Sequence, residues 1–389
     1  MNLAILHKEV QAFISNNLHN DIAKLILKGS PFATVSVQEL AEQIIAKKKA
    51  EKKLPSWFQT KNIYYPNKLN IEQASSEITA NYKANLVTGE SIIDITGGFG
   101  VDCLAFSKKC KQVVHCEIDE NLSKLVAHNC KQLKVNNIQA VCDDGINYLN
   151  KKQQKYDAIY VDPSRRDSLK KRVFLLEDCS PDLSVDLLGL FTYTSLILVK
   201  TAPILDIASA IDSLKFVKDI HVIAVNNEVK EVLYLLHKNY TGQVNYKTIN
   251  FSKKGKQIFD FICTTDECNY SLPKKYLYEP NSAILKAGSF QEVGINLNLE
   301  KLHKHSHLYT SNELIEFPGR VFNIMHIKAY KAKNKTKLGI KKANITTRNF
   351  PETVAEIRKK TKIKEGGNMY LFFTTNCKDE KIILVCEKR

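Results

Sequence analysis

The sequence predicts an α/β protein in which a doubly wound sheet follows an N-terminal helical region and precedes small C-terminal α+β domains. Two observations support this fold class. Short apolar runs alternate with helical patterns from residue 91 to residue 265, as a sheet with crossover helices requires. The first run, SIIDITGGFG at 91–100, ends in three glycines, which let a backbone approach a ligand closely.

The N-terminal residues 1–70 carry apolar side chains at helical spacing. Ser36 and Glu39 predict a capping box at the start of one helix, and Pro55 predicts its end. We expect Trp57 to anchor this region to the next domain. A further helix, from about 72 to 86, is expected to lead into the sheet.

The sheet is expected to contain seven strands, near 91–96, 112–117, 138–142, 157–162, 195–201, 219–225 and 258–265. Helices are expected near 101–109, 120–133, 144–151, 171–190, 203–214 and 228–238. The last strand follows a polar stretch containing Gly255 instead of a crossover helix. This suits an antiparallel final strand inserted beside its predecessor.

Composition and charge narrow the function. The 389 residues hold 57 Lys or Arg and 41 Asp or Glu, a formal net charge of +16. This excess favours nucleic acid as a partner, although a lysine-rich genome would produce it too. The ten cysteines form no CxxC pair, so we expect no metal site and no disulfides. The sequence shows no signal peptide and no long apolar run, which predicts a cytoplasmic protein without membrane contact.

Acidic residues follow successive predicted strands, at the edge where such sheets bind ligands. Asp94 opens the glycine loop. Glu117 ends the second strand, where a carboxylate can accept both hydroxyls of a ribose. Asp143 or Asp144, after the third strand, could accept an adenine amino group, and Asp162 follows the fourth strand in YVDPSRRD.

Together these motifs resemble class I S-adenosylmethionine-dependent methyltransferases. DITGGFG is similar to the family's D-x-x-x-G-x-G motif, with Thr96 where a glycine is commoner, and the later acidic residues follow in the family's order over about 75–265. More closely, LNIEQASSEITANYKA, DITGGFGVD and VDPSRR resemble the bacterial subgroup with a C-terminal THUMP-like domain and, more distantly, trimethylguanosine synthases. The resemblance implies a Rossmann-like seven-stranded methyltransferase sheet.

The same resemblance implies S-adenosylmethionine as the cofactor. The residues expected to bind it are Gln73, Ser75, Asp94, Thr96, Gly97, Gly98, Gly100, Glu117, Ile118, Asp143, Asp144 and Gly145. A plain helix cap explains Gln73 and Ser75 equally well. The expected domains are an N-terminal helical region at 1–70, the methyltransferase domain at 71–268, a ferredoxin-like α+β unit at 274–318 and a basic THUMP-like RNA-binding domain at 319–389.

The DPSRR loop supplies the expected catalytic set, Asp162, Pro163, Ser164 and Arg165. In amino-directed nucleic-acid methyltransferases, the corresponding loop holds an amino group while an aromatic side chain stacks on the base. Ser164 and Arg165 stand where a second proline and the aromatic would be. Either another residue stacks on the base, or the target is not a base amino group. Arg165 and Arg166 could hold an RNA phosphate or a carboxylate, or they could pair structurally with Asp167 or Asp162.

The segment 319–389 is strongly basic, with 18 Lys or Arg against 6 Asp or Glu. Its apolar runs are good strands, so we expect a folded module and not a disordered tail. Its resemblance to the THUMP-like domain implies RNA binding. The residues expected to contact RNA are Arg166, Lys328, Lys341, Lys342, Arg348, Asn349, Arg358 and Lys360.

These observations predict an enzyme that transfers a methyl group from S-adenosylmethionine to RNA, at a base nitrogen of structured rRNA or tRNA. Asp162 is expected to orient the acceptor. Two alternatives stay open: methyl transfer to a small molecule or a protein, and an RNA-binding module with a non-catalytic methyltransferase fold. A dehydrogenase is disfavoured because the first loop lacks the full GxGxxG spacing. The sequence does not predict the oligomeric state.

Overall fold

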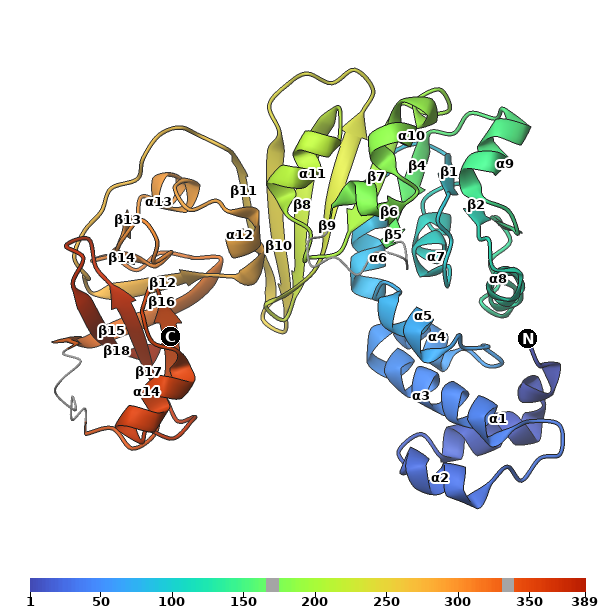
Figure 1. Cartoon of the computed structure of the whole chain (residues 1–389), viewed down its shortest axis with the longest axis horizontal. Helices are drawn as coiled ribbons and strands as arrows, with labels where there is room; N and C mark the ends of the chain where they lie inside the picture. Colours follow the sequence, from blue (N-terminus) through green and yellow to red (C-terminus); the bar gives the residue numbers. More distant parts are fainter. Residues whose placement is uncertain (166–174, 331–338) are drawn as a thin grey trace. The chain divides into compact units, whose positions relative to one another are not determined.

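The computed structural model describes residues 1–165, 175–330 and 339–389. The chain forms two compact units, residues 1–217 with 234–240 and residues 218–233 with 241–389. Figure 1 traces the chain from the N-terminal helices, in blue, to the C-terminal sheet, in red.

The N-terminal region is helical, as expected. Its segments are a 3₁₀ helix at Leu3–Leu6, α1 at Lys8–Asn16, α2 at Ile22–Lys28, α3 at Val37–Lys53 and α4 at Pro55–Gln59. The predicted capping box forms: Ser36 Oγ accepts the Glu39 N–H at 3.2 Å, and Glu39 Oε2 accepts the Ser36 N–H at 2.8 Å. Trp57 is buried, with its ring centroid 4.6 Å from that of Phe99 beyond β1. The expected anchor is therefore confirmed.

The single helix expected over 72–86 is wrong. Two helices occupy this segment, α5 at Lys68–Gln73 and α6 at Glu77–Ala84. Ser76 separates them because its hydroxyl accepts the Thr79 N–H at 3.2 Å and caps α6. A serine that caps the backbone in this way competes with continuation of the preceding helix. Ser75 consequently lies in the break between the helices, where it is buried.

The central sheet has nine strands in the order β11-β10-β8-β9-β7-β4-β1-β2-β3 (Figure 1). Their bounds are β1 Ser91–Asp94, β2 Gln112–Cys116, β3 Ile138–Val141, β4 Ala158–Val161, β7 Leu196–Thr201, β8 Val217–Val225, β9 Glu228–His237, β10 Asn245–Ser252 and β11 Gly255–Ile262. The connecting helices are α7 Val101–Ser107, α8 Glu120–Gln132, α9 Gly145–Lys152, α10 Leu183–Leu190 and α11 Ile207–Ser213. β1 pairs in parallel with β2 and β4, and β4 pairs in parallel with β7. This arrangement brings the carboxyl ends of four strands to one edge.

The end of this sheet corrects three expectations. Residues 228–238, expected as a helix, form β9, which lies between β7 and β8. A short apolar run such as VLYLL fits a buried helix or a buried strand equally well by periodicity. β9, and not the strand expected at 258–265, is thus the inserted strand. Residues 255–262 form β11, which pairs antiparallel with the unforeseen β10 and extends the expected seven strands to nine. The single helix expected over 171–190 is corrected as well: its described residues form a 3₁₀ helix at Leu176–Asp178 and, separately, α10 from Leu183.

The C-terminal sheet has seven strands in the order β13-β14-β12-β15-β18-β17-β16. Their bounds are β12 Tyr276–Pro280, β13 Glu300–Lys301, β14 Tyr309–Ser311, β15 Gly319–Ala329, β16 Asn344–Arg348, β17 Met369–Thr375 and β18 Lys381–Lys388. The accompanying helices are α12 Ser282–Ala287, α13 Glu292–Asn296 and α14 Val354–Thr361. Consecutive residues of β17 pack into two different hydrophobic cores. Phe372 belongs to the core that contains Phe322, and Phe373 belongs to the core that contains Ile357. The expected folded module is confirmed, and the ranges 274–318 and 319–389 both contribute strands to this one sheet.

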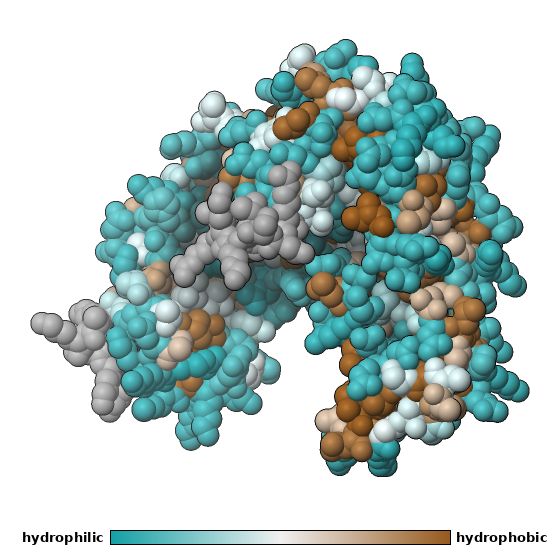
Figure 2. All heavy atoms as spheres, turned by 45° about the vertical axis from the view of Figure 1, so that its right-hand side comes forward, coloured by the Kyte–Doolittle hydropathy of each residue, from teal (hydrophilic) through white to brown (hydrophobic). Residues whose placement is uncertain are grey.

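Figure 2 shows a largely hydrophilic face, with apolar side chains gathered at the lower right over the N-terminal helices. There α2 exposes Ile26 and Leu27. No helix in the described ranges is both long and apolar enough to span a membrane.

Candidate active site

Asp94, the last residue of β1, shapes the glycine loop. Its buried Oδ1 accepts the N–H groups of Thr96 at 2.9 Å and Gly97 at 3.0 Å, and also the Thr96 hydroxyl at 2.9 Å. Burial raises the pKa of Asp94 to about 7, although the hydrogen bonds from Thr96 oppose the rise. The Asp94 carboxylate is buried and hydrogen-bonded to the loop, so it would act on a ligand indirectly, by holding the glycine loop in its conformation.

The glycines of this loop leave the backbone open. Gly97 has a φ of +42°, and a Cβ there would lie 2.3 Å from the Cys116 carbonyl oxygen. Gly98 has a φ of +69°, but nothing lies within 4 Å of the position of its Cβ. Gly100 precedes α7 and Gly145 begins α9, both at the same edge of the sheet. Gly98 is therefore the point where a ligand can approach the main chain.

Glu117 joins the first and second strand ends. Its Oε2 accepts the Gly98 N–H at 2.7 Å, and its Oε1 accepts the Asp119 N–H at 2.8 Å. Only 9% of Glu117 is exposed, whereas the next residue, Ile118, is 74% exposed. A fixed carboxylate beside an exposed apolar side chain suits a ribose and the flat face of a purine, respectively.

The two aspartates after β3 have different partners. Asp144 caps α9, accepting the Asn147 N–H at 2.9 Å. Asp143 pairs with Lys151, whose Nζ lies 2.7 Å from Oδ2, and this hydrogen bond lowers the pKa of Asp143. A ligand amino group at this position would compete with Lys151 for a hydrogen bond to the Asp143 carboxylate.

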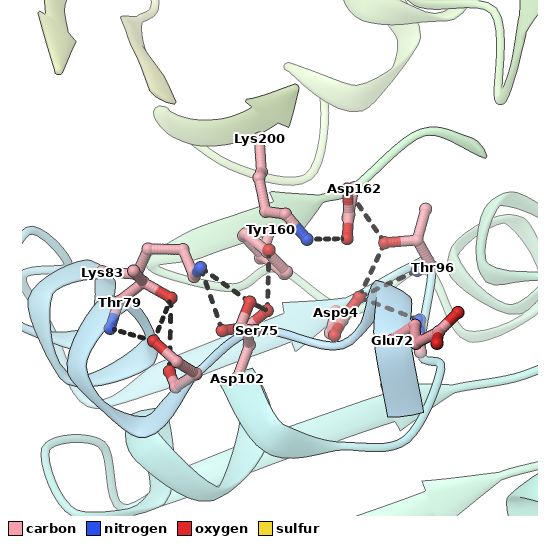
Figure 3. Close-up of polar contacts among 12 residues, drawn as sticks. Glu72, Ser75, Thr79, Lys83, Asp94, Thr96, Asp102, Tyr160, Asp162 and Lys200 are labelled. Atoms are coloured by element: carbon pink, nitrogen blue, oxygen red, sulfur yellow. Dashed lines mark hydrogen bonds and ion pairs between the residues drawn. The ribbon is translucent and has the colours of Figure 1, made fainter. Parts of the chain in front are cut away.

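A buried polar network that the sequence analysis missed lies next to the loop (Figure 3). Lys83 Nζ, on α6, is 3.2 Å from Asp102 Oδ1 on α7. Ser75 and Tyr160 both donate their hydroxyls to Asp102 Oδ2 at 2.9 Å. Burial would raise the pKa of Asp102, but the charges of Lys83 and Lys200, together with the hydrogen bonds from Ser75 and Tyr160, hold the pKa below its usual value. The network ties the α5–α6 break to α7, the helix that follows the glycine loop.

Ser75 is thus committed to this network, and Gln73 lies exposed at the end of α5. One signal in the sequence could have revealed the network. Lys83 falls on the buried face of a predicted helix, and a lysine in that position needs a nearby carboxylate.

Asp162 lies just beyond β4 and is held from two sides. Its main-chain N–H donates to Thr96 Oγ1 at 2.8 Å, which connects it to Asp94. Its carboxylate forms an ion pair with Lys200, near the end of the neighbouring β7. The Asp162 side chain is 38% exposed and that of Lys200 is 11% exposed. Figure 3 shows the two side chains pointing toward each other above Asp94 and Thr96.

Within the DPSRR loop, Ser164 and Arg165 form a small ribbon with a later segment. β5, at Ser164–Arg165, pairs antiparallel with β6, at Cys179–Ser180. Pro163 is half-buried and Ser164 is exposed. Arg166 lies outside the described residues. The ribbon places no described aromatic side chain at the position where amino-directed enzymes stack the base.

Three of the residues expected to bind RNA have partners within the protein. Arg348 Nη2 lies 3.0 Å from Glu279 Oε1, and Arg358 donates to the carbonyl oxygens of Ile363 and Ala343. Asn349 Nδ2 lies 2.9 Å from a ring nitrogen of His303. These contacts fix the fold of the C-terminal module.

The lysines expected to bind RNA are more accessible. Lys341 and Lys342 are exposed, and Lys328 is half-buried on β15. Lys360 is exposed too, but its Nζ lies 2.8 Å from Glu352. Lys341 and Lys342 are therefore the strongest candidates for phosphate contacts.

Comparison with known proteins agrees with this architecture. Family models match residues 43–180 (conserved hypothetical protein 95), 276–318 (ferredoxin-like domain) and 319–388 (THUMP domain-like). A search of curated proteins found no match. The crystal structure of a "putative methyltransferase" from Porphyromonas gingivalis W83 matches with 31% identity and a TM-score of 0.88, over 99% of this chain and 98% of that one.

Two further structures match only part of the chain. An rRNA methylase from Streptococcus thermophilus has 15% identity and a TM-score of 0.30, over 41% of this chain and 94% of that one. TrmK from M. capricolum, in complex with S-adenosylhomocysteine, has 14% identity and a TM-score of 0.31, over 42% and 68%.

The sheet order, the glycine loop and the acidic strand ends define a methyltransferase that uses S-adenosylmethionine. Given the identity and coverage of the match, the chain belongs to the family of the Porphyromonas gingivalis methyltransferase.

Proposed function

We propose that this methyltransferase transfers the methyl group of S-adenosylmethionine to a base nitrogen of structured RNA, either rRNA or tRNA. The observation that carries the proposal is that one chain combines two features. A partly exposed Asp162 lies at the same sheet edge as the glycine loop, and the C-terminal module is folded and strongly basic. Methyl transfer needs little more than an acceptor held in line with the donor, so a carboxylate for orientation and a surface for RNA supply the main requirements.

The site residues fit S-adenosylmethionine. The open backbone at Gly98 would receive the amino acid part, and Glu117 would accept the ribose hydroxyls. Ile118 would cover the adenine, and Asp143 would face its amino group. Bound there, the cofactor supplies a methyl group on a positively charged sulfur. The Ser75 segment, held by the Asp102 network, would close the site from the side of α5.

The C-terminal module supports RNA as the substrate. Apart from the lysines at 331–338, which lie outside the described residues, its basic residues belong to a module whose sheet contributes to two cores, so their positive charge is displayed on a folded surface. Lys341 and Lys342 are exposed on that module. Contacts of lysines with phosphates release counterions, so the affinity for RNA should fall steeply with salt.

Nucleoside mass spectrometry of total RNA from cells with and without the gene tests the proposal. One methylated nucleoside should disappear with the gene, return with the wild-type gene and stay absent with Asp162→Ala. Asp212→Ala, which removes an exposed aspartate of α11, is the matched control and should restore the nucleoside. An unchanged RNA profile, with methyl label entering a protein or a small molecule instead, would favour the alternative substrate classes.

A further inference from the structure

The Asp162–Lys200 ion pair joins the ends of two neighbouring strands, at the sheet edge that carries the glycine loop. Val161 and Val199 are register partners in the parallel pair β4–β7, and Asp162 and Lys200 each come one residue later. The pair therefore presents a carboxylate and an ammonium side by side at the sheet edge (Figure 3). Lys200 is nearly buried, so its charge acts in a medium that screens it poorly.

This pair matches one kind of nucleobase edge. A carboxylate only accepts hydrogen bonds, and an ammonium only donates them. A ring N–H next to a carbonyl group offers the complementary pattern, a donor beside an acceptor. An exocyclic amino group gains positive charge while it is methylated, which an adjacent ammonium would oppose. A ring nitrogen that first loses its proton leaves negative charge on the neighbouring carbonyl oxygen, which the ammonium would stabilise.

The loop after Asp162 also favours a ring nitrogen over an amino group as the acceptor, and this argument does not depend on the charges. The amino-directed arrangement needs an aromatic side chain soon after the acidic residue. Here Ser164 is exposed and Ser164–Arg165 is occupied in the β5–β6 ribbon. The described part of this loop thus lacks the side chain that would hold a base for methylation of its amino group.

Building on the proposed function, we propose that Asp162 and Lys200 together recognise a ring N–H beside a carbonyl group, the N1–O6 edge of guanine or the N3–O4 edge of uracil. Lys200 is then a catalytic residue. The ring proton passes to the Asp162 carboxylate while Lys200 keeps its own proton and stabilises the carbonyl oxygen. The ring nitrogen forms its bond to the methyl carbon as the carbon–sulfur bond breaks, and Asp162 afterwards releases the proton to water.

The identity of the lost nucleoside is the first test. Loss of N1-methylguanosine or N3-methyluridine from the RNA of cells without the gene supports the proposal. Loss of N2-methylguanosine, N6-methyladenosine or a ribose 2′-O-methylated nucleoside overturns it while leaving RNA methylation intact. No change in any RNA nucleoside overturns the proposed function itself, so the two failures are distinguishable.

Kinetics of Lys200→Met and Lys200→Arg give the second test, with total RNA from cells lacking the gene as substrate. Lys200→Met should lower the rate near pH 7 by about 10²-fold or more, with cofactor affinity within about threefold by calorimetry. The remaining rate of this variant should rise about tenfold per pH unit. The nucleobase would then have to lose its ring proton without the ammonium that stabilises the resulting negative charge. Lys200→Arg, which keeps the charge, should recover part of the rate.

Lys83→Met is the matched control, since it removes another buried lysine from the same region. It is expected to lower stability without adding this pH dependence. A folded Lys200→Met enzyme with the wild-type rate and pH profile would overturn the role of Lys200. If Lys200→Met does not fold, a folded Lys200→Arg enzyme decides. A rate loss of about 10²-fold or more, as large as that expected for removal of the charge, would refute a charge-stabilising role, and a smaller loss without new pH dependence would support it.

Discussion

Lys83 is completely buried and lies 3.2 Å from Asp102, which receives two further hydrogen bonds from Ser75 and Tyr160. The pair joins α6 to α7 and so connects the segment before the sheet to the glycine loop. A buried ion pair stabilises little by itself, but removal of one partner leaves a charge without compensation.

Asp102→Asn should therefore lower the free energy of unfolding by about 3–5 kcal/mol, because Lys83 would lose its counter-charge. The double variant Lys83→Met/Asp102→Asn should be less destabilised than Asp102→Asn alone, since no isolated charge remains. Urea unfolding of the wild type, both single variants and the double variant measures this. Simple addition of the two single effects would show that the pair is not coupled.

Asp94 should make stability depend on pH in the cofactor-free protein. Its folded pKa, about 7, is above the usual value of 3.8 because burial disfavours the charged form. The protein binds this proton more tightly when folded, so the contribution of Asp94 is fully present below about pH 4 and is lost as pH rises toward 7. The loss is on the order of 1 kcal/mol per pH unit in this window.

Asp94→Asn keeps a side-chain oxygen for the Thr96 and Gly97 N–H groups but cannot ionise. The variant should flatten the curve of unfolding free energy against pH between about 4 and 7. Parallel curves for wild type and variant would mean that Asp94 is charged in the folded protein throughout that range.

Gly97 and Gly98 form a matched pair for the methyl-donor site. Both have positive φ, which costs an alanine about 1–2 kcal/mol. At Gly97 a Cβ would also collide with the Cys116 carbonyl, whereas at Gly98 it would meet open space. Gly97→Ala should thus cost clearly more stability. Gly98→Ala should weaken S-adenosylmethionine binding by about tenfold or more at modest cost in stability, because its methyl group would enter the space of the ligand.

Thermal unfolding and calorimetry on both variants separate the two effects. Undiminished cofactor affinity in Gly98→Ala would mean that the cofactor does not approach the main chain there.

Charge reversal at two exposed lysines tests the RNA surface. Lys341→Glu/Lys342→Glu should weaken RNA binding and reduce the slope of log affinity against log salt by about 2, if each lysine contacts one phosphate. Lys24→Glu/Lys28→Glu makes the same charge change on α2 and should bind RNA nearly as the wild type does. Equal weakening by both pairs in a gel-shift titration would indicate a general charge effect instead of a specific surface.

The sequence allowed prediction of those features that depend on local signals. The Ser36–Glu39 capping box, the glycine loop and the order of acidic residues at strand ends follow from short motifs, and the structure contains each of them. β9 was missed because a five-residue apolar run fits a helix and a strand alike. The α5–α6 break was missed because Ser76 caps a helix only if the preceding one ends there.

Contacts between distant residues could not be predicted from spacing. Asp102 meets Tyr160 across 58 positions, and Asp162 meets Lys200 across 38. Likewise, no local pattern showed that Arg348 and Arg358 are held by a carboxylate and by carbonyl oxygens, respectively. In a basic segment, only the folded structure distinguishes an arginine that supports the module from a lysine that remains exposed.

Transfer of tritium-labelled methyl groups from S-adenosylmethionine to RNA is the most direct measurement. The substrate is total RNA from cells lacking the gene, incubated with the purified full-length protein. We predict that label enters one RNA species with the wild type and with Asp212→Ala, and that Asp162→Ala transfers none while its cofactor affinity stays within about threefold of the wild type. A wild-type protein that binds S-adenosylmethionine but leaves this RNA unlabelled would contradict the account.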